Sequence, residues 1–168
     1  MTDILVIGSI NLDLSASIAR LPGPGETVTG AKLSRFPGGK GANQALAARR
    51  LGADVRLIAC AGDDAFADEA LALLREGGVD LSGLQRLEGE ATGIALIAVS
   101  AAGENQIVVA PGANAMMPAD NLDLGKADAL ICQLEIPGNV IARAAEQFDG
   151  FFCANLAPAR EIDVTILQ

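Results

Sequence analysis

A glycine-rich segment that runs into an alanine-rich stretch, residues 36–45, holds the residues best suited to bind a ligand. Three glycines within four positions allow positive φ angles and let a ligand approach the main chain closely. The helix predicted for residues 42–51 directs its free N–H groups back at this loop. Lys40 therefore lies where the helix dipole disfavours a cation, by roughly 0.3–1 kcal/mol. We expect an anionic or polyhydroxylated group to compensate it.

The loop matches neither of two common nucleotide-binding motifs. Gly41 follows Lys40 where a P-loop has Ser or Thr, and Ser34 stands where the first glycine of that loop belongs. After the first predicted strand, Gly8-Ser9-Ile10 lacks the other glycines of a dinucleotide-binding fingerprint. A tight turn that caps a helix is the ordinary structural alternative. The loop alone does not decide between this alternative and a ligand site.

Other polar side chains follow the predicted strands. In an open parallel sheet, ligands bind beyond the carboxyl ends of the strands. The residues just past the apolar runs are Asn11, Asp13, Gly62, Asp63, Glu135 and Asn155. Carboxylates and carboxamides around a crevice suit a polyol, because carboxylates accept hydrogen bonds from hydroxyls and amides both donate and accept. Each residue also has a structural explanation, as a solvated strand end, a helix-start residue or an N-cap. Only their convergence favours a ligand site.

The order of the predicted elements indicates a layered α/β/α domain with a mainly parallel sheet. Apolar runs typical of buried strands lie at residues 4–7, 55–60, 129–134 and 151–154, and residues 9–14 continue the first of them. Helices are predicted at residues 42–51, 65–76 and 137–148, with Gly52 as C-cap of the first and Asp63 or Asp64 as N-cap of the second. Strand-like runs at 27–36 and 92–110, the latter a hairpin around 101–105, predict a second, smaller sheet.

Composition restricts the classes of function. The 168 residues suffice for one domain with a core, and 51% hydrophobic but only 3% aromatic residues make that core aliphatic. With 12 basic and 21 acidic residues the net charge is −9, which leaves no basic patch for a nucleic acid partner. Histidine is absent from the sequence, and this excludes His-based metal sites and Ser-His triads.

The three cysteines and the N-terminus indicate a cytoplasmic protein. Cys60, Cys132 and Cys153 each lie in an apolar run without metal-ligand spacing, so we expect buried, reduced thiols. Met1 is followed directly by a strand-like run, without the pattern of a secretory signal peptide. No apolar run approaches the roughly 20 residues that cross a bilayer, so no membrane association is expected.

Nine short motifs are spread along nearly the whole chain. They are residues 8–13 (GSINLD), 24–28 (PGETV), 38–45 (GGKGANQA), 62–64 (GDD), 90–93 (EATG), 103–105 (GEN), 111–114 (PGAN), 133–135 (QLE) and 155–160 (NLAPAR). Together they resemble the N-terminal portion of the ribokinase-like, phosphofructokinase-B type family of sugar kinases. The glycine-lysine loop is specific to the wider family. Its combination with Ser-Ile-Asn-x-Asp and Gln-Leu-Glu resembles the ribokinase branch.

The resemblance implies ATP-dependent phosphorylation of D-ribose at its 5-hydroxyl, giving D-ribose 5-phosphate. It implies Mg²⁺ bound with ATP and leaves open activation by a monovalent cation such as K⁺. The residues that would bind the sugar are Asn11, Leu12, Asp13, Gly39, Lys40, Gly41, Ala42, Asn43 and Glu135. Strands within 27–36 and 92–110 would form a lid over the sugar and join two copies of the chain into a homodimer.

The resemblance is confined to the N-terminal portion of such kinases, so residues 1–168 are expected to be part of a longer ribokinase-like domain. The family's Gly-Ala-Gly-Asp segment, which carries the anion hole and the catalytic base, does not occur in the sequence. Phosphoryl transfer requires both substrates to be positioned, so we expect no catalytic residue here and no activity of the chain alone. The apolar end of the chain leads us to expect self-association or partial disorder near residues 160–168.

Two alternatives to a ribose kinase stay open from the residues. One is a non-catalytic fragment that binds sugar or mediates dimerisation. The other is a related kinase that acts on a nucleoside or on another sugar, since the same polar residues would serve either substrate.

Overall fold

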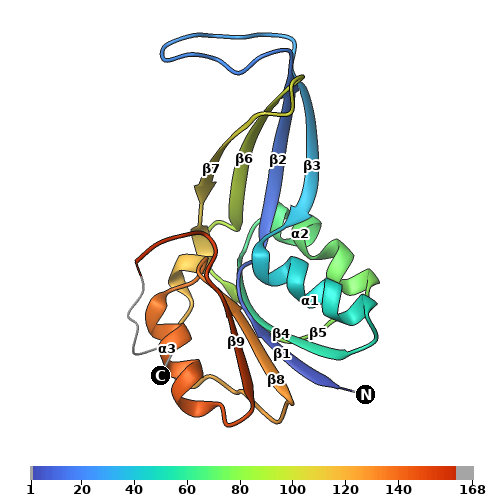
Figure 1. Ribbon diagram of the computed structural model, residues 1–168, viewed down its shortest axis with the longest axis vertical. Coiled ribbons are helices and arrows are strands. Elements are labelled where there is room, and N and C mark those ends of the chain that lie inside the picture. Colours follow the sequence, from blue (N-terminus) through green and yellow to red (C-terminus); the bar gives the residue numbers. More distant parts are fainter. Residues whose placement is uncertain (1, 162–168) are drawn as a thin grey trace.

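The computed structural model describes residues 2–161, which form two β-sheets and flanking helices (Figure 1). Sheet A is entirely parallel, with the strand order β5-β4-β1-β8-β9. Its strands are β1 (Asp3–Ile7), β4 (Asp54–Gly62), β5 (Asp80–Leu87), β8 (Ala129–Gln133) and β9 (Phe151–Asn155). The central strands read as continuous apolar runs because both of their faces are covered.

Helices cover both faces of sheet A. They are α1 (Lys40–Arg50), α2 (Ala65–Glu76) and α3 (Gly138–Gln147). The chain moves across the sheet in one direction from β1 to β4 and in the opposite direction from β8 to β9. Right-handed crossovers therefore place α1 and α3 on opposite faces. Figure 1 shows α1 and α2 together on one side of sheet A and α3 on the other.

Sheet B stands beyond the carboxyl ends of the sheet A strands (Figure 1). Its strands are β2 (Asn11–Ile18), β3 (Lys32–Gly38), β6 (Gly93–Ser100) and β7 (Asn105–Ala110), in the order β3-β2-β6-β7. The pair β2–β6 is parallel, whereas β2–β3 and β6–β7 are antiparallel hairpin pairs. The two hairpins come from distant parts of the sequence, and sheet B therefore forms only when both are in place.

A polar joint fixes the base of sheet B against sheet A. Asp64 caps α2 by accepting a hydrogen bond from the Ala67 N–H at 3.0 Å. Its carboxylate also accepts bonds from the backbone N–H of Thr92 at 2.8 Å and from the Thr92 hydroxyl at 2.7 Å. The Thr92 hydroxyl oxygen in turn accepts from the Gly62 N–H at 3.1 Å. Desolvation raises the pKa of Asp64, but these hydrogen bonds outweigh it and hold the pKa below its usual value.

Most predicted elements are confirmed. The second helix has the predicted bounds, and Asp64 rather than Asp63 is its N-cap. The first helix begins at Lys40, two residues before the predicted start, and ends at Arg50 with Leu51 as its C-cap. Gly52, which was predicted as the C-cap, follows one residue later with φ 97°, as is common after a helix C-terminus. The predicted hairpin is β6–β7, closed by the loop 101–104. The layered α/β class with a mainly parallel sheet and a smaller second sheet is confirmed.

Three expectations about strands were wrong or incomplete. Residues 11–14 do not extend the first strand within its sheet, because the chain leaves sheet A after β1 and pairs in sheet B. Residues 27–31 form no strand and belong to a long connection beyond sheet B, where Arg20 is paired with Glu26 (Figure 1). Strand β5 was not predicted, because its half-exposed residues at the edge of sheet A lack a clear apolar alternation.

The expectation of three buried thiols was wrong for one of them. Burial raises the pKa of Cys60 to about 11 and that of Cys132 to about 12. Cys153 is exposed, because β9 is the edge strand of sheet A and the face that bears Cys153 is uncovered, as it is at Phe151. No helix within residues 2–161 is long and apolar enough to cross a membrane. The expectations for residues 162–168 lie outside the described part of the chain.

Candidate functional site

The glycine loop packs against the connection between β1 and β2. Gly39 is the N-cap of α1 with φ 92°, and a Cβ there would lie 2.8 Å from the Asn11 nitrogen. A Cβ on Gly41 would lie 2.5 Å from the Ser9 nitrogen. Close main-chain packing therefore requires both glycines, and the positive φ of Gly39 favours glycine at that position in addition. This packing brings the N-terminus of α1 to the carboxyl end of β1, beside Asn11.

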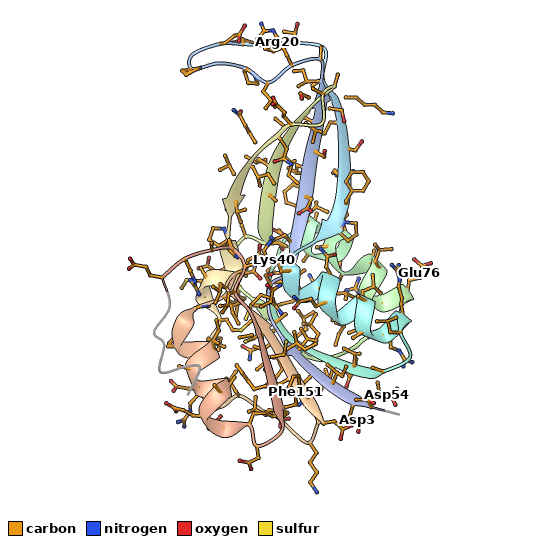
Figure 2. The ribbon with its side chains drawn as sticks, viewed as in Figure 1. Asp3, Arg20, Lys40, Asp54, Glu76 and Phe151 are labelled. Carbon is orange, nitrogen blue, oxygen red and sulfur yellow. The ribbon has the colours of Figure 1, made fainter. Side chains whose placement is uncertain are left out.

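The group that compensates Lys40 belongs to the chain itself. Glu135, just past the end of β8, places Oε1 at 3.3 Å from the Lys40 ammonium, and its Oε2 accepts the Lys40 backbone N–H at 2.9 Å. The Ser9 hydroxyl donates to the same Oε2 at 2.5 Å. A carboxylate at the N-terminus of α1 is favourable for the helix dipole. Lys40 and Glu135 are thereby held together at the junction of the two sheets, where Figure 2 labels Lys40.

Asp13 lies on β2, and its surroundings in the site raise the pKa of its carboxyl group. Burial raises its pKa, the nearby Glu135 carboxylate raises it further, and Lys40 opposes both effects. The carboxyl group fits against Gly38 on the neighbouring strand, because a Cβ at that position would lie 2.5 Å from it. Asp13 is therefore a hydrogen-bond acceptor kept partly out of water.

A cavity of about 150 Å³ joins these groups. Its polar lining comprises Asn11 and Asp13 from β2, Gly39, Lys40 and Asn43 from the glycine loop and α1, and Glu135 after β8, and its apolar lining comprises Ala95, Ile97, Ile107 and Val109 from β6 and β7. Six of the nine sugar-binding residues predicted from the sequence thus line one cavity. It is polar on one side and apolar on the other, as a site for a sugar ring with hydroxyls on its edge would be.

The other predicted residues lie near the cavity without lining it. Leu12 is buried in the core, and Gly41 and Ala42 donate backbone N–H groups to Ser9, at its hydroxyl and its carbonyl respectively. Asp63 and Asn155 are exposed and line neither this cavity nor the larger one beside it. Of the six residues selected by the strand-end rule, Asn11, Asp13 and Glu135 line the smaller cavity, whereas Gly62, Asp63 and Asn155 line neither cavity.

A second, larger cavity of about 730 Å³ adjoins the first. The two share Asn11, Lys40, Ile107, Val109 and Glu135. The larger one extends towards Arg160, whose guanidinium donates to the Ile136 carbonyl at 2.8 Å. The Lys40–Glu135 pair thus stands between a small polar recess and a wider opening.

The resemblance predicted strands within 92–110 as a lid over the sugar, and four apolar residues of these strands line the cavity: Ala95, Ile97, Ile107 and Val109. Sequence reasoning did not indicate which face of these strands lines the cavity, and it missed two buried polar residues. Ser9 and Asn114 belong to motifs that supported the family resemblance without an assigned role. Their partners are 126 and 104 residues away in the sequence, so no local pattern could have identified those contacts.

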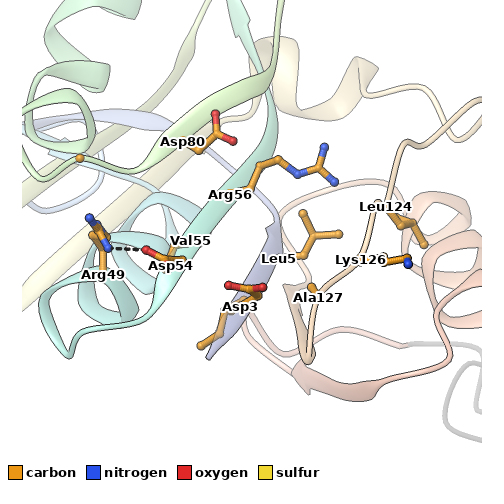
Figure 3. Close-up of a pocket in the computed structure, with 12 residues that line it drawn as sticks. Asp3, Leu5, Arg49, Asp54, Val55, Arg56, Asp80, Leu124, Lys126 and Ala127 are labelled. Carbon is orange, nitrogen blue, oxygen red and sulfur yellow. Dashed lines mark hydrogen bonds and ion pairs between the residues drawn. The ribbon is translucent and has the colours of Figure 1, made fainter. Parts of the chain in front are cut away.

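A separate hollow of about 290 Å³ lies at the amino-terminal end of the sheet A strands (Figure 3). It is lined by charged residues of both signs. Arg49 is paired with Asp54 at 2.9 Å, and Arg56 is paired at 3.4 Å with Asp123, which lies outside the lining. Because the hollow lies at the end of sheet A opposite the carboxyl ends of the strands, it is not the candidate site.

The parallel sheet with a polyol-sized recess at its carboxyl ends, covered by a second sheet, defines a ribokinase-like α/β fold. Residues 1–149 match the model of the family described as pfkB family carbohydrate kinase. The chain belongs to this family of kinases.

Individual relatives agree with this assignment. The ribokinase of Schizosaccharomyces pombe is 41% identical over 148 residues, which is 82% of this chain and 46% of that protein. The crystal structure of ribokinase from Thermotoga maritima superposes with a TM-score of 0.92 at 34% identity, covering 100% of this chain and 57% of that one. The structure of Arabidopsis thaliana ribokinase complexed with ribose and ATP superposes with a TM-score of 0.82 at 30% identity, covering 93% of this chain and 54% of that one. The chain spans about half the length of these relatives.

Proposed function

We propose that this chain forms the sugar-binding part of a kinase that transfers the γ-phosphoryl group of ATP to the 5-hydroxyl of D-ribose. The observation that carries the proposal is the convergence of Asn11, Asp13, Lys40, Asn43 and Glu135 on one 150 Å³ cavity. The ligands in the printed name of the Arabidopsis structure, ribose and ATP, support the same pair of substrates.

Each polar residue has a defined part in the proposed sugar site. Ionised Asp13 accepts hydrogen bonds from sugar hydroxyls, and Asn43 can donate or accept beside it. Glu135 holds Lys40 in place and offers its remaining acceptor capacity to the sugar. Leu12, Gly41 and Ala42 act through the backbone geometry of the two segments. The apolar residues of sheet B cover the ring and exclude water, which strengthens the hydrogen bonds beneath them.

The remaining parts of the reaction are proposed from the family. The sugar hydroxyl oxygen bonds to the γ-phosphorus, the bond from that phosphorus to the ADP oxygen breaks, and the hydroxyl proton leaves to a base. We assign the base and the nucleotide pocket to the portion of the relatives that this chain does not match. The family resemblance also implies Mg²⁺ bound with ATP, and it leaves open activation by a monovalent cation such as K⁺. Within residues 2–161 there is no group of three or more His, Cys, Asp or Glu side chains that could hold a metal ion.

Sheet B is proposed to be the lid and the dimer interface. Apolar side chains are exposed on both faces of this sheet, with Leu96 beside Val108 on one face and Ile107 beside the half-buried Ile97 on the other. Exposed apolar area of this kind is typical of surfaces that another chain covers. The free thiols of Cys60, Cys132 and Cys153 support a reducing, cytoplasmic location.

Calorimetric titration with D-ribose tests the sugar site directly. We expect the 168-residue chain to bind D-ribose and the Asp13→Asn variant to lose at least about tenfold in affinity, because a bond to a charged acceptor is lost. Asp63→Asn is the matched control, since Asp63 is exposed and lines neither cavity. Equal affinity of wild type and Asp13→Asn would refute the site. Stronger binding of another sugar or of a nucleoside would replace ribose as the substrate. Ribose binding without phosphorylation, when ATP and a separately made C-terminal portion of the kinase are both added, would favour a non-catalytic sugar-binding fragment.

A further inference from the structure

Asn114 carries a buried carboxamide that the proposed function leaves unexplained. It lies in the short 3-10 helix η1 (Gly112–Met116), after β7, and its exposed fraction is 1%. Its Oδ1 accepts the backbone N–H of Ile10 at 2.9 Å. Its Nδ2 donates to the Ile10 carbonyl at 3.0 Å and to the Asn11 Oδ1 at 2.8 Å. Both N–H donors of Asn114 are therefore used.

The backbone of Ile10 fixes the direction of the Asn114 amide. An N–H group only donates and a carbonyl only accepts, so the reversed amide would bring donor against donor and acceptor against acceptor. The second donor of Asn114 then faces Asn11, which must present its Oδ1. The Nδ2 of Asn11 is consequently turned away from Asn114. Asn11 is 3% exposed and lines both cavities, so its own donors are directed at the ligand space.

The start of β6 leaves room for this pair of amides. A Cβ on Gly93 would lie 2.2 Å from the Asn11 Oδ1 and 2.3 Å from the Asn114 Nδ2. No side chain could occupy that position without displacing one of the two amides. The hydrogen bond between Asn11 and Asn114 is thus enclosed by backbone on the side of sheet B.

We propose that Asn114 is a positioning residue that sets the Asn11 amide with its N–H donors towards the ligand. The ligand must then place an acceptor oxygen beside Asn11 and a hydrogen-bond donor beside Asp13. A hydroxyl group satisfies both, because it donates its proton to the Asp13 carboxylate and accepts from Asn11 through its oxygen. The identity of the ligand as a sugar rests on the proposed function, whereas the orientation of the Asn11 amide does not.

Asn114→Asp reverses the orientation without changing the size of the side chain. One carboxylate oxygen still accepts the Ile10 N–H, but the other faces the Asn11 Oδ1. The Asn11 amide then turns to donate to the new carboxylate, and it presents an acceptor to the ligand. We expect D-ribose affinity, measured by calorimetry, to fall about tenfold or more. Asn105→Asp, at an exposed position of β7, introduces the same charge and should bind ribose like wild type.

A double-mutant cycle separates positioning from a general structural role. In the Asn11→Ala background the group that Asn114 orients is absent, so Asn114→Asp should change ribose affinity less than about twofold. An equal loss in both backgrounds, or no loss in either, would overturn the proposal. If Asn114→Asp does not fold, Asn114→Ala is used in the same cycle, because it releases the Asn11 amide without adding a charge.

Side-chain amide exchange by NMR tests the orientation without any ligand. In the wild-type chain the Asn114 Nδ2 hydrogens should exchange slowly with water and those of Asn11 at least about tenfold faster, and Asn114→Asp should slow the Asn11 exchange. The opposite order in the wild type would overturn the proposal. If the wild type shows the expected order but does not bind D-ribose, the positioning role stands and the proposed function fails.

Discussion

Removal of the Thr92 hydroxyl by Thr92→Val should destabilise the joint between the two sheets. The valine keeps the shape of the side chain but can neither donate to Asp64 nor accept from the Gly62 N–H. Loss of a hydrogen bond to a charged group costs about 1.5–3 kcal/mol, and an unsatisfied backbone N–H adds about 1–3 kcal/mol. Burial of the additional methyl group of valine stabilises the folded state by about 1 kcal/mol. The expected loss is therefore about 1.5–5 kcal/mol.

Thermal unfolding followed by circular dichroism measures this loss, since the chain has no Trp or Tyr for fluorescence. For a domain of this size the Tm should fall by about 3–20 °C. Thr92→Ser is the matched control, because it keeps the hydroxyl and removes one methyl group at about 1 kcal/mol. Equal Tm values of the valine and serine variants would refute the energetic role of the hydroxyl.

The pH dependence gives an independent check on the same bond. The pKa of Asp64 is lowered in the folded state, so its contribution is present above the usual pKa of 3.8 and is lost as the pH falls through the folded value. The Thr92 hydroxyl is one of the groups that lower this pKa. The difference in unfolding free energy between wild type and Thr92→Val should therefore narrow in the acid range below about pH 4.

Three further predictions follow from single contacts. Because the pKa of Asp13 is raised in the folded state, its contribution to stability is present below pH 3.8 and is lost as the pH rises through the folded pKa. At pH 7, Asp13→Asn should therefore unfold at an equal or higher urea concentration than the wild type. A lower urea midpoint for the variant would contradict the desolvation argument. Gly93→Ala should cost about 1–3 kcal/mol through displacement of the amide pair, whereas Gly138→Ala, with open space around its Cβ, should leave the urea midpoint nearly unchanged. A thiol reagent at pH 8 should modify only Cys153 in the native chain and all three cysteines in urea. Reaction of two or more native thiols would show that β4 or β8, which carry the buried Cys60 and Cys132, opens readily.

The sequence predicts those parts of the site that depend on local geometry. Asp13 and Glu135 each follow an apolar run, and parallel strands bring such residues to one edge of the sheet whatever the rest of the fold does. The position of Lys40 at a helix start predicts that an anionic or polyhydroxylated group compensates its charge, and in the structure that group is the Glu135 carboxylate. The identity of that partner was not predictable, because the two residues are 95 positions apart in the sequence.

Local sequence patterns could not predict that the chain leaves sheet A after β1 and continues as a strand of sheet B. Residues 9–14 alternate as a strand whether they extend β1 or begin a second sheet, and only the packing of Gly39 and Gly41 against residues 8–11 makes the chain turn there. The exposure of Cys153 was missed for a related reason. An apolar run indicates a strand, but its composition does not indicate whether that strand is central or at the edge of the sheet.

The central position of β1 has a consequence for synthesis on the ribosome. This strand pairs with β4 on one side and with β8 on the other, and Asp3 donates a backbone hydrogen bond to Asp128, 125 residues later. At about 5–20 residues per second, that interval takes about 6–25 s to translate. During this time the β1–β4 pair can form while the opposite edge of β1 has no partner. An apolar parallel edge is a template for pairing with another chain, so the nascent protein is most prone to aggregation before β8 emerges.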